Sequence, residues 1–225
     1  MRRLLLEKFR LGLFDQRYVD ADAAGTVVGR ADFVEAGLEA QRASYTLLTN
    51  HNDILPLNTG LNVYVEGVDP TALEPYATVV TDPAAADVAL IRLKAPYEPR
   101  PGGFEAHFHA GSLEFPVEEV HRVQALFSTV PTIVDLYLDR PAVVPEIAAG
   151  AAALLINYGS STRAFTDVLF GHASPQGRLP FDLPSSTKAV EESRSDVPFD
   201  TADPLFHFGD GTSYSRSWTD KALPA

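Results

Sequence analysis

Cysteine is absent from the 225-residue chain, and this absence removes several classes of chemistry. Without thiols the protein has no disulfide, no zinc–thiolate site, no iron–sulfur cluster and no cysteine nucleophile. Positive charge is scarce as well, because 18 Lys and Arg stand against 30 Asp and Glu, for a formal net charge of −12. Nucleic acids and anionic membrane surfaces attract clustered positive charge, so neither is an expected partner.

Long apolar runs are also missing. Arg2 and Arg3 precede three leucines, as in a signal peptide, but charged residues from Glu7 onward interrupt the run. No apolar stretch has the length that spans a bilayer. A cytoplasmic protein is therefore expected, and 45% hydrophobic residues at this length suit one large globular domain.

Glycine-rich phosphate-binding motifs are absent too, since neither G-x-G-x-x-G nor a Walker-type loop occurs. One strand-to-helix turn, at Ser160, lies where an α/β-hydrolase places its nucleophile. However, Tyr158 and Thr162 replace the two glycines of the G-x-S-x-G motif. The favoured interpretation is a helix N-cap formed by Ser160 or Ser161, and a nucleophilic serine is the alternative.

Short apolar runs typical of buried parallel strands alternate with helical segments. The runs predict strands at 61–68, 78–81, 87–93, 131–138 and 152–156. The helical spacing predicts helices at 2–11, 32–48, 117–128 and 162–170. Residues 14–30 are interpreted as a linker, and a proline-rich irregular tail is expected after Gly171. This alternation predicts an α/β fold with a mainly parallel, doubly wound sheet and helices on both faces.

The segment after the 87–93 run carries the best candidates for a functional site. Ligands of open α/β sheets bind outside the carboxyl ends of the strands, and Glu98 and Glu105 lie on a loop at such an end. Tyr97 and Phe104 on the same loop offer rings that can stack on a sugar. Composition alone favours solvated loop charge, with a carboxylate site as the alternative.

Two histidines on this loop, His107 and His109, form a candidate metal pair on one side of a strand. A third ligand at a recognisable spacing is missing, so an exposed loop is the favoured interpretation. No metal and no cofactor are therefore expected.

Several segments, taken in their order and spacing, carry a resemblance. Residues 2–15 look like a final barrel helix and its linker, and residues 40–50 with 54–57 look like the helix and first strand of a second domain. Four later segments have the form of a strand–helix–turn signature and a closing aromatic–glycine motif: Asn157–Ser161, Asp167–Gly171, Ser174–Pro180 and Phe208–Tyr214. Together the segments resemble the family 3 glycoside hydrolases across nearly the whole chain.

The resemblance implies a three-layer α/β sandwich with a sheet of about six strands. It also implies a domain of a retaining β-glycosidase, whose Asp nucleophile lies in a barrel and whose acid/base, often a Glu, lies in the second domain. Lys94 and Ala95 stand where many relatives carry that Glu, so Glu98 is the expected acid/base and Glu105 the next candidate. The side chains expected to bind the sugar are Tyr97, Phe104 and Arg100.

The resemblance also predicts how the chain is organised. Residues 1–30 would be the last barrel helix with its linker, 31–184 the sandwich domain, and 185–225 an irregular tail packed on that domain. With one barrel helix and no barrel, the chain is expected to be inactive until it meets a partner, which is a separate barrel chain or a second copy. The alternatives are a non-catalytic carbohydrate-binding or interaction module and, more weakly, an independent hydrolase using Ser160 or the histidine pair.

Overall fold

The structure is a computed structural model that describes residues 1–194, 196–197 and 199–214. It divides into two compact units, Met1–Leu38 and Glu39–Ala225. The α-helices are α1 (Arg2–Arg10), α2 (Ala21–Val27), α3 (Ala31–Ser44), α4 (Val117–Thr129), α5 (Pro145–Gly150), α6 (Thr162–Leu169) and α7 (Thr187–Glu192). The strands are β1 (Thr46–Asn50), β2 (Asn62–Glu66), β3 (Thr78–Val80), β4 (Val88–Lys94), β5 (Thr132–Tyr137), β6 (Ala153–Asn157), β7 (Leu183–Pro184) and β8 (Pro204–Phe206). No helix in these ranges is long and apolar enough to cross a bilayer.

The first unit has no core of its own, because Leu38 is its only buried residue. The predicted linker at 14–30 is partly helical, since α2 lies within it. The Asp20 side chain explains this helix, because it accepts the N–H groups of Asp22 and Ala23 at 3.0 Å and so caps the first turn. The predicted boundaries at residues 30 and 184 remain predictions.

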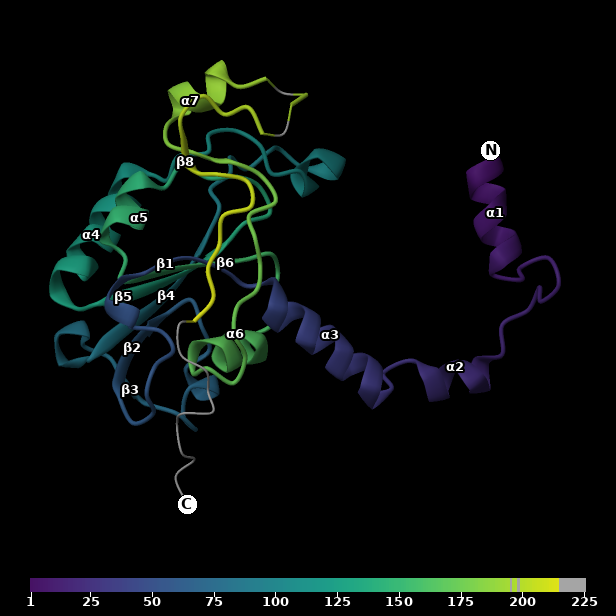
Figure 1. Ribbon diagram of the computed structural model, residues 1–225, viewed down its shortest axis with the longest axis horizontal. Helices are drawn as coiled ribbons and strands as arrows, with labels where there is room; N and C mark the ends of the chain where they lie inside the picture. The colour runs from purple at the N-terminus through teal and green to yellow at the C-terminus, as the bar shows by residue number, and fades with distance from the viewer. Residues whose placement is uncertain (195, 198, 215–225) are drawn as a thin grey trace. The chain divides into compact units, whose positions relative to one another are not determined.

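The second unit contains a six-stranded sheet with the order β1-β6-β5-β4-β2-β3. Every neighbouring pair is parallel except β1 with β6, which is antiparallel. The predicted mainly parallel sheet of six strands is therefore confirmed. Figure 1 shows α4 and α5 on one side of this sheet and α6 on the other, which is the three-layer arrangement.

The two faces of the sheet differ in chemistry because side chains alternate along each strand. On the α4 and α5 face, Ile91, Val134 and Leu154 pack with buried residues such as Val123 and Ile147. The opposite face is also buried, but it carries Arg92 and Asp135 beside apolar neighbours. A charged pair thus lies inside the α6 side of the sandwich.

The first strand lies earlier than the sequence predicted. The helix expected to reach residue 48 ends at Ser44, and β1 occupies Thr46–Asn50, whereas the strand had been placed at 54–57. Apolar residues continue across this junction without a break in spacing, which hides the change of structure. The Asn50 side chain accepts the Leu55 N–H and donates to the Leu55 carbonyl, both at 3.0 Å, so the chain turns where the strand was expected.

The carboxyl-terminal segment is more regular than its prolines suggested, because β7, α7 and β8 lie within it. Two of its described residues donate hydrogen bonds to the backbone of the sandwich. The Thr212 N–H donates to the Leu47 carbonyl at 2.8 Å, and the Tyr214 hydroxyl donates to the Val168 carbonyl at 2.7 Å. Residues 215–225 lie outside the described residues.

Candidate functional site

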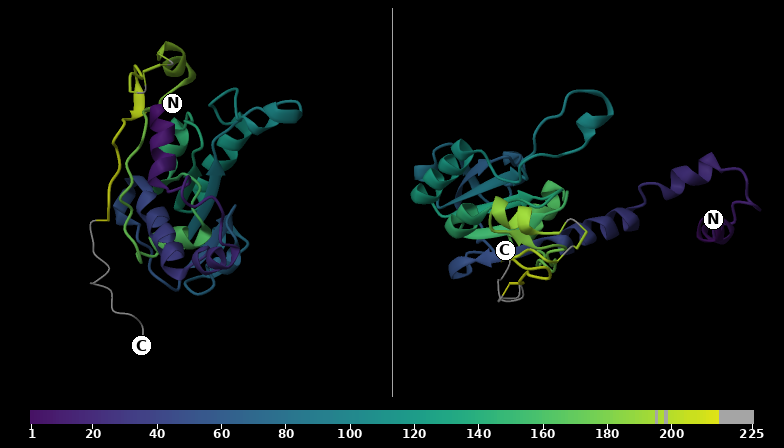
Figure 2. Two further views of the ribbon diagram at one scale, coloured as in Figure 1. Left: turned by 90° about the vertical axis from the view of Figure 1, so that its right-hand side faces the viewer. Right: turned by 90° about the horizontal axis from the view of Figure 1, so that it is seen from above.

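The connection between β4 and α4, residues 95–116, forms an arm that projects from the carboxyl edge of the sheet (Figure 2). Its two sides meet at an antiparallel bridge, where the Glu98 N–H donates to the Ala110 carbonyl at 2.8 Å. A 3-10 helix, η4 (Gly103–His107), lies beyond the bridge. The predicted site loop is therefore a structured arm at the edge where open α/β sheets bind ligands.

Glu98 lies along the backbone of the opposite side of the arm. Its Oε1 accepts the Ser112 N–H at 3.1 Å. Gly111 makes this approach possible, because a Cβ there would lie 2.3 Å from the Glu98 Cδ. Gly111 also has a φ of +86°, which favours glycine. The carboxylate is thus held in one direction while its residue remains exposed.

The base of the arm is attached to the segment that follows β5. The Tyr97 and His109 rings stack with centroids 3.8 Å apart and an angle of 8° between their planes. The His109 Nδ1 pairs with the Asp139 carboxylate. The Arg140 Nη2 donates to the Gly111 carbonyl at 2.8 Å. These contacts fix the backbone on both sides of Glu98.

The candidate histidine pair is split by these contacts. His109 belongs to the base of the arm, whereas His107 is exposed on η4. Within the described ranges, no group of three or more His, Asp or Glu side chains is arranged as a metal site. The structure assigns His109 to the attachment of the arm.

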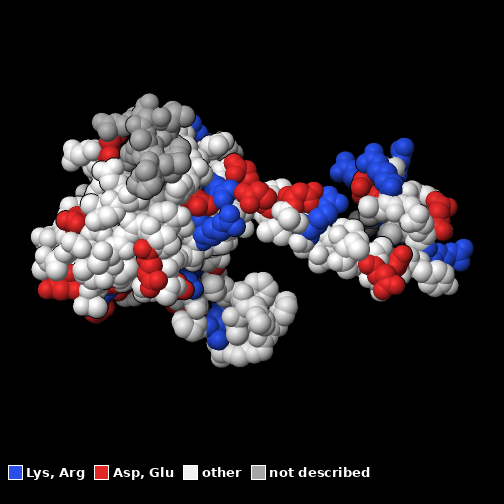
Figure 3. Space-filling view, turned by 90° about the horizontal axis from the view of Figure 1, so that it is seen from below, with Lys and Arg blue, Asp and Glu red and all other residues white. Residues whose placement is uncertain are grey.

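The far part of the arm is exposed and mainly apolar. Phe104, 79% exposed, meets Phe108 edge to face with ring centroids 5.1 Å apart. Arg100 and Glu105 are exposed, and neither side chain has a hydrogen bond or ion pair with another described residue. Figure 3 shows the face of this arm as mostly uncharged. The structure therefore places Tyr97 and Glu98 together near the base and Phe104 and Glu105 on the η4 segment.

The Ser160 turn is a helix start. The Asn157 Oδ1 accepts the Gly159 N–H at 3.1 Å and the Ser160 N–H at 3.4 Å. The Ser161 Oγ then accepts the Ala164 N–H at 3.3 Å as the N-cap of α6. No described His or carboxylate is hydrogen-bonded to Ser160, so the serine has no base to activate it. The N-cap interpretation is confirmed, with Ser161 as the capping residue.

A buried charged pair beneath this edge is the feature that sequence reasoning missed. The fully buried Asp135 carboxylate accepts the Arg92 Nε at 2.6 Å on one oxygen and the Asn157 amide at 2.7 Å on the other. Burial raises the pKa of Asp135, while the Arg92 guanidinium and the Asn157 amide lower it. Burial also raises the pKa of the nearby Tyr45 hydroxyl. The signal was a charged residue between apolar neighbours in each of two strand-like runs, Arg92 within 87–93 and Asp135 within 131–138.

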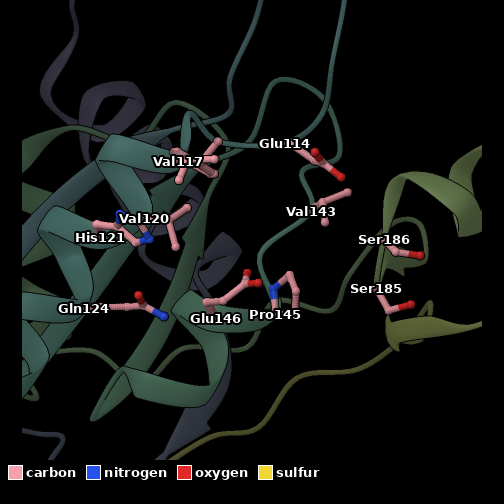
Figure 4. A pocket seen from close by; sticks show the side chains of 11 residues that line it. Glu114, Val117, Val120, His121, Gln124, Val143, Pro145, Glu146, Ser185 and Ser186 are labelled. Carbon is pink, nitrogen blue, oxygen red and sulfur yellow. The ribbon is translucent and has the colours of Figure 1, made fainter.

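A pocket of about 380 Å³ lies beside the start of α4. Figure 4 shows Gln124 of α4 and Glu146 of α5 on its sides, with Ser185 and Ser186 across from them. None of the described residues that line it is Lys or Arg, so its polar groups are carboxylates, hydroxyls, an amide and an imidazole. It lies next to the end of the arm, because the Val143 N–H donates to the Leu113 carbonyl at 2.9 Å.

A comparison with models of known protein families shows to which family the chain belongs. The model of the glycosyl hydrolase family 3 C-terminal domain matches residues 71–214, which include the arm and the buried pair. The chain belongs to this family. The match covers the strands β3 to β6 of the six-stranded sheet together with the arm.

Relatives of this family 3 domain carry glycosidase names. The chain is 56% identical over 220 residues to the probable beta-glucosidase C of Aspergillus flavus, covering 96% of this chain and 35% of that protein. It is 53% identical to the beta-glucosidase C of Emericella nidulans, covering 94% of this chain and 35% of that protein. It is 37% identical to the periplasmic beta-glucosidase/beta-xylosidase of Dickeya chrysanthemi, covering 94% of this chain and 33% of that protein. The chain spans about a third of the length of these relatives.

A solved structure shows the same fold. The beta-glucosidase from Listeria innocua in complex with glucose matches with a TM-score of 0.70 at 23% identity, covering 95% of this chain and 38% of that one. At this identity the likeness concerns the fold alone.

Proposed function

We propose that this chain is the C-terminal domain of a retaining β-glucosidase and supplies the general acid/base, Glu98, to a sugar site completed by a barrel. Tyr97, Phe104 and Arg100 contact the sugar. The proposal draws on the family, on the names of the relatives and on the position of the arm.

The observation that carries the proposal is the fixed, exposed carboxylate of Glu98. The Ser112 amide and the close packing on Gly111 hold this group in one direction. A general acid must be within hydrogen-bond reach of the atom it protonates, and a fixed carboxylate meets that requirement once a substrate is bound. By contrast, the Glu105 side chain has no described hydrogen bond or ion pair to fix it.

The role of Glu98 follows from retaining chemistry. In the first step it donates a proton to the glycosidic oxygen as the bond to the anomeric carbon breaks and the nucleophile of the barrel takes its place. In the second step it accepts a proton from the water that releases the sugar. This chemistry needs the two carboxyl groups roughly 5–5.5 Å apart. An acid also needs a water-poor site, which an exposed carboxylate acquires when a second surface covers the arm.

The amino-terminal unit supports a barrel partner. Its helix α1 is amphipathic, and its large apolar residues, among them Leu4 and Phe9, have no core within residues 1–38 to join. A helix of this kind is stabilised by packing against another surface. A barrel of the same family provides that surface, and a second copy of this chain is the alternative.

The test of Glu98 uses the full chain mixed with a separately produced family 3 barrel. We compare cellobiose, which has a poor leaving group, with 2,4-dinitrophenyl β-glucoside, whose leaving group needs no proton. Glu98→Gln should lower kcat/KM for cellobiose at least about 100-fold and change kcat/KM for the activated substrate far less, because kcat/KM reports the first step, in which only cellobiose needs a proton. Glu105→Gln is the matched control and should lower neither substrate more than about twofold. The reverse pattern would assign the role to Glu105, and no effect of either variant would contradict the proposal.

A second candidate function is a carbohydrate-binding module without catalysis. The exposed Phe104 and the stacked Tyr97 favour it, because aromatic rings of this kind bind sugars without any chemistry. Calorimetry with cellobiose would then show binding that Phe104→Ala weakens, while the mixture with a barrel shows no turnover.

A further inference from the structure

The segment that follows β5 contributes two consecutive side chains, Asp139 and Arg140, to the base of the arm. Both reach the segment that carries Glu98, although they follow it by about 40 residues in the sequence. We infer that Arg140, assisted by Asp139, is a positioning residue that orients the Glu98 carboxylate through the arm's backbone. The inference rests on the proposed role of Glu98.

The step from Arg140 to Glu98 passes through one peptide group. The Arg140 Nη2 donates to the Gly111 carbonyl at 2.8 Å, and the Ser112 N–H of that same peptide donates to the Glu98 Oε1 at 3.1 Å. A peptide group is planar, with its C=O and N–H pointing in opposite directions. Fixing the carbonyl on the arginine therefore fixes the direction of the N–H that holds the carboxylate. A cation on the oxygen also polarises the peptide and strengthens the donor.

The second route is through stacked rings. The Asp139 carboxylate pairs with the His109 Nδ1, and the His109 ring lies flat against Tyr97 at 3.8 Å. Tyr97 is the residue before Glu98, so holding its ring restricts the backbone from which the carboxylate extends. The two routes act on the two sides of the arm, and the Glu98–Ala110 bridge joins these sides.

The position of the Glu98 side chain requires a glycine at residue 111. An alanine there would place its Cβ 2.3 Å from the Glu98 Cδ and 2.7 Å from its Cβ, so the whole side chain would have to leave the Ser112 amide. Gly60 provides a matched control, because its φ of +83° is nearly that of Gly111 and nothing lies within 4 Å of its added Cβ. Comparing the two variants separates backbone strain from displacement of Glu98.

The first measurement is a pH titration of the backbone amide resonances of the full chain by NMR. The Ser112 amide should follow the ionisation of Glu98, and this dependence should disappear in Glu98→Gln. It should also be reduced at least about twofold in Arg140→Ala and in Gly111→Ala, since both lose the aligned donor. Arg163→Ala, which removes an arginine of α6 away from the arm, and Gly60→Ala should leave it unchanged. The inference is overturned, without any activity assay, if the Ser112 amide resonance does not depend on the ionisation of Glu98. It is also overturned if the pH dependence of this resonance is the same in Arg140→Ala as in the unsubstituted chain.

The second measurement uses the mixture with a barrel. Arg140→Ala and Asp139→Asn should lower cellobiose turnover about 10-fold or more, with the loss in kcat. They should change kcat/KM for 2,4-dinitrophenyl β-glucoside less than about twofold, because the first step of that substrate needs no proton from Glu98. A loss that is equal for both substrates indicates a merely structural role and overturns the inference. If Glu98→Gln itself fails to discriminate between the substrates, the proposed function fails, and the NMR titration still decides the positioning.

Discussion

Removal of Arg92 should leave Asp135 as an uncompensated charge inside the sandwich. Asp135 is completely buried, and the Arg92 Nε and Nη2 both lie 2.6 Å from its Oδ2. Breaking a buried ion pair by deleting one partner costs about 3–5 kcal/mol, because the remaining charge cannot regain its hydration. We expect Arg92→Met to lower the free energy of unfolding by this amount, whereas the double variant Arg92→Met/Asp135→Leu should recover most of it.

The assay is urea unfolding followed by circular dichroism, with Asp135→Leu included to complete a double-mutant cycle. The pH dependence adds a second test. Burial already raises the pKa of Asp135, and loss of Arg92 raises it further. An acid whose pKa is higher in the folded than in the unfolded state is stabilising below its ordinary pKa of about 3.9, and this contribution is lost as the pH rises through the folded-state pKa.

Arg92→Met should therefore be least destabilised near pH 4 and most destabilised near pH 8. A single variant that costs less than about 1 kcal/mol at pH 8, or a double variant as unstable as the single one, would refute this account of the pair.

Substitutions at three further positions test local packing and helix stability. Gly177→Ala should destabilise by more than about 2 kcal/mol in urea unfolding, because its Cβ would lie 2.3 Å from the Ser44 carbonyl oxygen. Gly37→Ala, in the interior of α3 with open space at its Cβ, should stabilise by about 0.5–1 kcal/mol in the same assay. Ser161→Ala should cost about 1 kcal/mol through the lost cap of α6, and Ser161→Asp should restore most of it. A neutral Gly177→Ala or Ser161→Ala would contradict the geometry at that position.

The core of the sandwich could be predicted because buried parallel strands appear in the sequence as apolar runs. The runs at 87–93 and 131–138 match β4 and β5 within one residue at each end. β1 was misplaced because Tyr45 to Leu48 continue a helical spacing, so only the antiparallel pairing with β6 shows the strand. The helix α5 was missed because its six residues are too few for a periodic signal. The cytoplasmic location stays a prediction.

The candidate site was predictable in place and not in detail. Topology alone puts the loop after β4 at the ligand-binding edge, so Tyr97 and Glu98 could be named. Their partners could not, since Ser112, Asp139 and Arg140 reach them only through the conformation of the arm and the pairing of distant segments. The buried pair could not be predicted for the same reason, because Arg92 and Asp135 become neighbours only through the register of β4 and β5.

The measurement that tests the central claim most directly is hydrolysis of cellobiose and chromogenic β-glucosides by the chain alone and by the chain mixed with a family 3 barrel. The account predicts turnover only in the mixture and loss of cellobiose turnover in Glu98→Gln. Turnover by the chain alone, or a mixture that remains inactive although the two proteins bind each other, would contradict it.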